Sequence, residues 1–160
     1  MISSERKESG VARLYVYKCR NDPDTEFSAY GDWLRVFEAA GPVAWGGVWA
    51  TQHPTSIEIF ESEIQPGDLI LAWQTDKHAA VGVAEVVGFE MRGQDRQVLL
   101  EAREEFPRPV QLHKLKKSTN PELNSVSALK QGKVATIYRT DHSEARALLN
   151  ACSSRYAGLV

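Results

Sequence analysis

Three tryptophans have the chemistry needed to hold a flat aromatic ligand such as a nucleobase: Trp45, Trp49 and Trp73. Aromatic rings above and below a base exclude water and stack on it, a contact worth ~1–3 kcal/mol per base. Trp45 and Trp49 flank a Gly-Gly pair in a segment of loop character, where core packing explains a large apolar side chain less well. Trp73 ends an apolar run, so packing and binding explain it equally well. The sequence therefore predicts that Trp45 or Trp49 contacts a ligand.

Basic residues gather in the later part of the chain, although the whole chain has a net charge of −2. Residues 1–91 carry −7, residues 92–139 carry +5 and residues 140–160 are neutral. Such asymmetry is typical of a face that binds a polyanion, but an unevenly charged solvated surface produces it too. Basic side chains on phosphates would position a nucleic-acid strand without reading its sequence. The candidates for such backbone contacts are Arg108, Lys114, Lys116, Lys117, Lys130 and Lys133.

The sequence lacks the common motifs for catalysis and metal binding. It has no nucleophile elbow, no phosphate-binding loop and no HExxH pattern. Its four histidines have no metal-ligand spacing, and its two cysteines, Cys19 and Cys152, lie far apart. We therefore expect no metal, no cofactor and no catalytic residue.

Apolar and alternating runs predict the strands that would position these side chains. Residues 69–74 and 80–89 are predicted to form a hairpin, with its connection at residues 76–78. Residues 41–51 are expected to form a loop, and residues 56–63 fit a strand or a short helix equally well. Further strands are expected at residues 13–17, 97–103, 110–113 and 134–138.

Helical periodicity predicts three helices. Residues 30–40 form the first, which places Trp33 in the core, and residues 121–131 form a second, short helix. Asp141 and Glu144 have the spacing of a capping box and open the third. The inward faces are expected to consist of Leu34, Phe37 and Ala40, of Leu123, Val126 and Leu129, and of Ala145, Leu148, Leu149 and Cys152.

A chain of 160 residues fits one domain with a sizeable core. We expect a disordered polar lead over residues 1–11, the folded domain over residues 12–152 and a tail over residues 153–160. No run approaches the ~18 apolar residues that span a bilayer. The N-terminus also lacks the apolar core of a signal peptide, so a cytoplasmic location is expected.

The order and spacing of these segments resemble the EVE domain, a PUA-like β-barrel related to the YTH and ASCH domains. The strongest segments are residues 66–74 (PGDLILAWQ) and 80–87 (AVGVAEVV). Residues 14–21 (LYVYKCRN) resemble the first strand and its polar loop, and residues 44–51 (AWGGVWAT) resemble the Trp-bearing segment of the base pocket. The resemblance covers residues 12–152, with later matching elements at residues 106–112, 115–117, 127–132 and 137–138.

This resemblance implies an α+β fold, a PUA-like, EVE-type curled mixed β-barrel of five to six strands with short flanking helices. It implies a module that binds DNA or RNA and holds one modified base, flipped into an aromatic pocket. The candidate bases are 5-methylcytosine, 5-hydroxymethylcytosine and N6-methyladenine. The implied partners are nucleic acid and a fused or associated nuclease or motor subunit of a restriction or defence system, with no membrane.

The resemblance also assigns the pocket. In the related families the segment after the first strand meets the base edge or a phosphate, and the Trp-bearing segment supplies a wall. The implied base-binding residues are therefore Trp49, Trp45, Trp73, Lys18, Cys19, Asn21 and Thr51, and Arg20 joins the backbone-binding group.

One departure keeps alternatives open. YTH domains carry another Trp after the hairpin, whereas here only Phe89 and Met91 lie near that place, which favours a modified cytosine over N6-methyladenine. An ASCH-like amidohydrolase acting on an N4-acylated cytidine would need Lys18, Thr51 and Glu85 to converge. An RNA-binding domain without preference for modification is the third alternative. The sequence also fits both a whole protein and an excised module.

Overall fold

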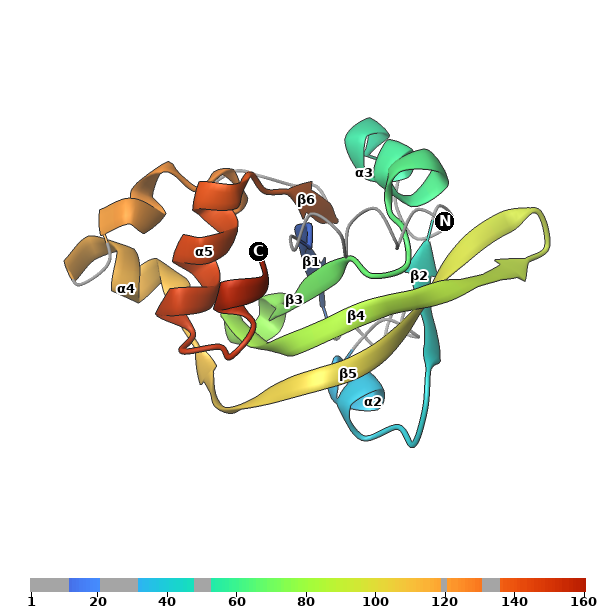
Figure 1. Ribbon diagram of the computed structural model, residues 1–160, viewed down its shortest axis with the longest axis horizontal. Coiled ribbons are helices and arrows are strands. Elements are labelled where there is room, and N and C mark those ends of the chain that lie inside the picture. The colour runs from blue at the N-terminus through green and yellow to red at the C-terminus, as the bar shows by residue number, and fades with distance from the viewer. Residues whose placement is uncertain (1–11, 21–31, 48–52, 119–120, 131–135) are drawn as a thin grey trace.

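The protein is an α+β structure around one six-stranded mixed sheet with the order β2-β5-β4-β3-β1-β6 (Figure 1). This computed structural model describes residues 12–20, 32–47, 53–118, 121–130 and 136–160, without the side chains of residues 116–118. Strands β1 and β3 are parallel and the other neighbours are antiparallel. The strands are β1 (Leu14–Cys19), β2 (Val43–Gly47), β3 (Leu69–Gln74), β4 (Ala79–Arg92), β5 (Asp95–Val110) and β6 (Ile137–Arg139).

The sheet curls, because its distant strands approach one another. Three strands lie between β2 and β1 in the sheet order, yet the Tyr17 hydroxyl donates a hydrogen bond to the Trp45 carbonyl at 3.3 Å. Register shifts interrupt the β2–β5, β3–β4 and β4–β5 pairs, and such bulges bend a sheet. No pairing joins β2 to β6 among the described residues, so the curled sheet stays open there. The expected α+β class with a curled mixed sheet of five to six strands and short helices is thus confirmed, although the sheet does not close into a barrel in the described part of the chain.

Two apolar cores cover the two faces of the sheet. Successive residues of β3 alternate between them: Leu69, Leu71 and Trp73 join one, whereas Ile70 and Ala72 join the other. Every residue of β3 is buried, which explains its continuous apolar sequence. The first core lies under α4 (Leu112–Ser118) and α5 (His142–Ala151), and the second under α2 (Leu34–Phe37) and η3 (Ile59–Glu63) (Figure 1).

The hairpin and the last helix follow the sequence prediction. Strand β3 has the predicted bounds, and η4 (Thr75–Lys77) with His78, whose φ is 50°, forms the connection. Asp141 and Glu144 form both hydrogen bonds of the capping box at the start of α5. The predicted inward residues of α5 are all buried.

Several predicted elements have other bounds or another type. The helix expected at residues 30–40 is only the four-residue α2 in the described part of the chain, and residues 56–63 are helical, within α3 (Pro54–Glu58) and η3. The helix expected at residues 121–131 is two 3-10 turns, η5 (Pro121–Ser125) and η6 (Ser127–Leu129), although Leu123, Val126 and Leu129 point inward as predicted. Asn21 lies outside the described residues.

The strand prediction was wrong in two places. Residues 43–47 form β2 and not a loop, because β5 offers them an edge to pair with. Residues 110–113 end β5 and begin α4, because Leu112 and Leu115, three apart, both turn toward the core. Strand β4 also runs past its predicted end to Arg92, where it pairs with the start of β5, and β5 continues past residue 103 because it pairs there with Gly82 and Val83 of β4.

The last residues of the chain contact the body of the fold. Val160 is buried, its carbonyl accepts a hydrogen bond from Arg146 Nε at 3.2 Å, and Ala12 N donates to Leu159 O at 2.7 Å. A short turn, η7 (Ala157–Leu159), precedes Val160. Among the described segments, no helix combines the length and the hydropathy that crossing a membrane requires.

Candidate nucleic-acid interface

The candidate site begins where β1 ends beside β3. Lys18 is in register with Trp73, and Cys19 with Gln74. Gln74 is buried: its Oε1 accepts from Trp33 N at 2.9 Å, and its Nε2 donates to Cys19 O at 3.4 Å and to Asp76 Oδ1 at 2.7 Å. One amide therefore fixes the end of β1, the entry to α2 and the hairpin connection. The role of Gln74 in joining these three segments was not predictable from the sequence, because a polar residue at the end of an apolar run indicates only the end of a strand.

The Lys18 amine faces the first core and not open solvent. Its Nζ donates to Ala128 O at 2.7 Å and lies 4.6 Å from the centre of the Tyr138 ring and 5.4 Å from that of Trp73. Burial lowers the pKa of Lys18 from 10.5 to about 8. In this arrangement the side chain ties β1 to the η6 turn, directly before Lys130.

We expect Lys18→Met to change how stability depends on pH. Because folding lowers the Lys18 pKa to about 8, the unfolded chain holds a proton between pH 8 and 10.5 that the folded chain has released. The free energy of unfolding therefore rises with pH in that window through this group. Methionine does not titrate, so wild type should gain stability relative to Lys18→Met from pH 8 to 10, as urea denaturation would measure. Lys114→Met, which removes an exposed amine, is the control, and parallel pH profiles of wild type and Lys18→Met would contradict the assignment.

The structure does not bring Trp45 and Trp73 together. Trp45 is 1% exposed in the second core, with its ring centre 5.3 Å from that of Trp33. Trp73 is 2% exposed in the first core, where His113 meets it edge-on at 5.4 Å. The two indoles therefore pack on opposite faces of the sheet and do not form two walls of one slot. Trp49 lies outside the described residues, so its role as a wall stays a prediction.

The other predicted base-binding residues do not form a pocket in the described part of the chain either. Cys19 is buried in the second core, and burial raises the pKa of its thiol, which keeps it protonated. Asn21 and Thr51 lie outside the described residues.

Exposed basic residues surround the α4 side of the molecule. Arg108 precedes α4 on β5, Lys114 lies on α4, and Lys130 follows η6 directly; all three are exposed. No Asp or Glu occurs between Glu105 and Glu122. Arg20 is exposed at the end of β1. Lys116 and Lys117 also belong to α4, but their side chains and Lys133 lie outside what the structure describes.

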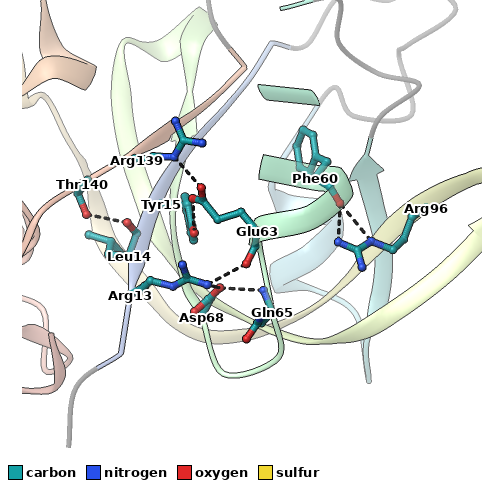
Figure 2. A network of polar contacts seen from close by, with 10 residues as sticks. All are labelled: Arg13, Leu14, Tyr15, Phe60, Glu63, Gln65, Asp68, Arg96, Arg139 and Thr140. Carbon is teal, nitrogen blue, oxygen red and sulfur yellow. Dashed lines mark hydrogen bonds and ion pairs between the residues drawn. The ribbon is translucent and has the colours of Figure 1, made fainter. Parts of the chain in front are cut away.

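A polar network fastens η3 to the sheet and does not form an anion site. Glu63 accepts hydrogen bonds from the Tyr15 hydroxyl at 2.7 Å and from Arg139 Nε at 2.8 Å, as Figure 2 shows. Burial alone would raise the pKa of Glu63, but these donors outweigh it and lower the pKa. Arg13 donates to Glu63 O at 2.8 Å and meets Asp68 at 3.5 Å. The adjoining cavity of about 220 Å³ is therefore bordered by arginines that carboxylates already engage.

A second cavity, of about 190 Å³, opens between α2 and the last part of β5. Leu34, Phe37 and Phe106 give it an apolar lining, and Asp32, Glu105 and Lys77 also border it. The two carboxylates outnumber the one amine, and carboxylates repel phosphate, so this cavity does not suit a nucleic-acid backbone.

The residues of the amidohydrolase alternative do not converge in the described part of the chain. Glu85 is in register with Leu69, and Lys18 with Trp73, four residues further along β3. At ~3.3 Å per residue that separates them by roughly 13 Å. Glu85 instead forms an ion pair with Arg103 at 3.1 Å. Thr51 lies outside the described residues.

Similar folds occur among solved structures, although the sequence matches no protein-family model and no curated protein sequence. Human THYN1, solved in complex with 5-methylcytosine-containing DNA, is similar at 10% identity and a TM-score of 0.65, over 90% of this chain and 99% of that one. A hypothetical protein from Leishmania major has 14% identity and a TM-score of 0.61, over 89% and 95%. A protein from Agrobacterium tumefaciens has 19% identity and a TM-score of 0.59, over 92% and 94%. The chain thus has the α+β PUA-like fold that it shares with THYN1.

Proposed function

We propose that this chain is an EVE-type module that binds nucleic acid and reads one modified base, flipped into a pocket to which Trp49 contributes a wall. The observation that supports this most strongly is the fold: the chain matches THYN1 over 99% of the solved THYN1 chain, and THYN1 was solved with 5-methylcytosine-containing DNA. The basic side near α4 and the end of β1 supply the complementary positive charge. The module would act without catalysis of its own.

A modified cytosine is the base that the aromatic content favours. In the place where a YTH domain has a further Trp, this chain has only Phe89 and Met91, near the end of β4, which argues against a cage for N6-methyladenine. A methyl group on cytosine adds apolar area that an aromatic wall removes from water, worth about 0.8 kcal/mol. We propose in addition a role within a restriction or defence system, with a nuclease or motor subunit as partner.

A panel of otherwise identical oligonucleotides tests it. The panel would contain 5-methylcytosine, 5-hydroxymethylcytosine, N6-methyladenine or no modification, as DNA and as RNA. We expect the strand with one of the two modified cytosines to bind at least about fourfold more tightly than the plain strand. A factor of about four in affinity corresponds to about 0.8 kcal/mol. Equal affinities throughout the panel would leave an RNA- or DNA-binding domain without preference, and no binding at all would refute the proposal.

Charge reversal on α4 should weaken plain and modified strands alike. Lys116→Glu with Lys117→Glu removes two phosphate contacts, which carry no base information. Each lost contact should reduce the slope of log affinity against log salt by about 0.9 on duplex DNA, as fluorescence titrations over a salt series would measure. Arg92→Glu, at the end of β4, is the charge-reversal control. The tip of the β4–β5 hairpin and α4 lie at opposite ends of the molecule in Figure 1. An unchanged slope in the α4 variant would place the phosphate contacts elsewhere.

A further inference from the structure

Ser56 on α3 is one of the few fully buried polar residues in the described part of the chain. Its Oγ accepts hydrogen bonds from Thr136 N at 3.1 Å and from Ile137 N at 3.2 Å. It donates to Ile137 O at 3.3 Å. A hydroxyl has one donor and two acceptor positions, so Ser56 uses its complete hydrogen-bonding capacity on two residues at β6.

These contacts satisfy the hydrogen-bonding needs of the Ile137 N–H and C=O at the outer edge of the sheet. Among the described residues, β6 ends the strand order and pairs with no strand but β1, so its outward N–H and C=O groups need other partners. Ser56 supplies them from inside the protein, where water does not reach. The start of α3 is thereby fixed to β6 by three directional bonds in addition to apolar packing.

The same bonds reach the end of β1. The peptide group that links Thr136 to Ile137 donates its N–H to Ser56, and its carbonyl accepts a hydrogen bond from Lys18 N at 2.8 Å. Ser56, Thr136 and Lys18 thus form a continuous chain of hydrogen bonds from α3 to the strand end that leads to Arg20. In the sequence, Trp49 and Thr51 lie shortly before α3, and Lys18 and Asn21 lie at and after the end of β1.

We propose that Ser56 is a positioning residue for base reading, because it holds the start of α3 at a fixed place relative to the end of β1. This inference rests on the proposed function. Ser56 itself contacts no ligand: a buried hydroxyl with every position occupied has none left for one. Its contribution is geometric, since a base held between two chain segments is recognised only if both keep their separation.

The test compares Ser56→Ala with Ser62→Ala. Ser62, on η3, is exposed and its Oγ donates only to Glu58 O of the adjoining turn at 3.1 Å, so it controls for the loss of a helical serine hydroxyl. The readout is the ratio of affinities for the preferred modified strand and the plain strand. We expect the ratio, about fourfold or more in wild type, to fall toward one in Ser56→Ala with the plain-strand affinity and its salt slope unchanged, and to persist in Ser62→Ala.

Two further measurements keep the inference falsifiable if Ser56→Ala folds poorly. Ser56→Thr retains the hydroxyl and should retain the ratio even where its melting temperature falls. In wild type, hydrogen exchange of the Thr136 and Ile137 amides should slow more with the modified strand than with the plain strand. If the wild type discriminates and Ser56→Ala keeps the full ratio, the proposed role of Ser56 is wrong, whereas the proposed function stands. Equal protection of the two amides by the modified and the plain strand would have the same meaning. A wild type with no preference would overturn the proposed function and this inference with it.

Discussion

Replacing Trp49 with alanine should weaken binding of the preferred modified oligonucleotide by ~1–3 kcal/mol, or about 5- to 150-fold. The indole is expected to form a wall against which the flipped base stacks. Flipping a base out of a duplex costs a few kcal/mol, and the pocket must offset that cost. The loss should be larger for the modified strand than for the plain one, because the wall also contacts the added methyl. Fluorescence titration of both strands measures the two losses.

Lys116→Ala is the appropriate comparison for Trp49→Ala. Removing a phosphate contact should cost the same for both strands, whereas removing a wall of the pocket should not. Circular dichroism of each variant checks that folding is unchanged. Equal losses for Trp49→Ala on the two strands would show that this side chain does not discriminate, and the function would then reduce to general nucleic-acid binding.

The sequence predicted those elements whose signals are local. Strand β3 has a continuous apolar run between turn residues, and the structure gives it the predicted bounds. The start of α5 depends on two side chains three residues apart, Asp141 and Glu144, and both of their capping bonds form. Such patterns determine structure within a few residues, so distant parts of the chain have little chance to override them.

The errors arose where a distant partner decides the outcome. The Gly-rich segment around Trp45 lacks a clear strand pattern, but pairing with β5 makes it β2 and buries the indole against Trp33. Trp33 has helical spacing, yet its Nε1 donates to Trp73 O at 3.1 Å, and α2 extends only from residue 34 to 37. Ser56 carried no signal at all, because its partners lie some 80 residues later in the chain.

The site was predictable in its chemistry and less so in its geometry. Lys18 was assigned to the base pocket by resemblance, and the structure directs its amine to Ala128 O between aromatic rings. Trp45 and Trp73 were each candidates to line a slot with Trp49, but they lie on different strands, β2 and β3, and their side chains pack on opposite faces of the sheet. Residue types therefore indicated an aromatic, basic binder, and only the register of the strands separated the side chains.

The largest expected effect on stability comes from Gly82→Ala near the start of β4. A Cβ at this position would lie too close to the Glu104 carbonyl oxygen on β5 and to the Phe37 ring on α2. The carbonyl belongs to the paired backbone, so relief requires moving a strand and not rotating a side chain. Overpacking of this kind costs about 1–3 kcal/mol and more where backbone must shift, so the free energy of unfolding should fall by about 3 kcal/mol. Urea denaturation followed by circular dichroism measures the change.

Gly88→Ala in the same strand provides the matched control. There the nearest atom to an added Cβ is Leu99 Cδ1 at 3.6 Å, an ordinary contact with the end of a flexible side chain. Alanine restricts the unfolded chain more than glycine does, so this variant should be unchanged or more stable by about 0.5–1 kcal/mol. The two substitutions are chemically identical and differ only in what each methyl meets. Equal destabilisation by both would mean that β4 disfavours alanine in general and that the close contact of Phe37 with Gly82 does not hold α2 against the sheet.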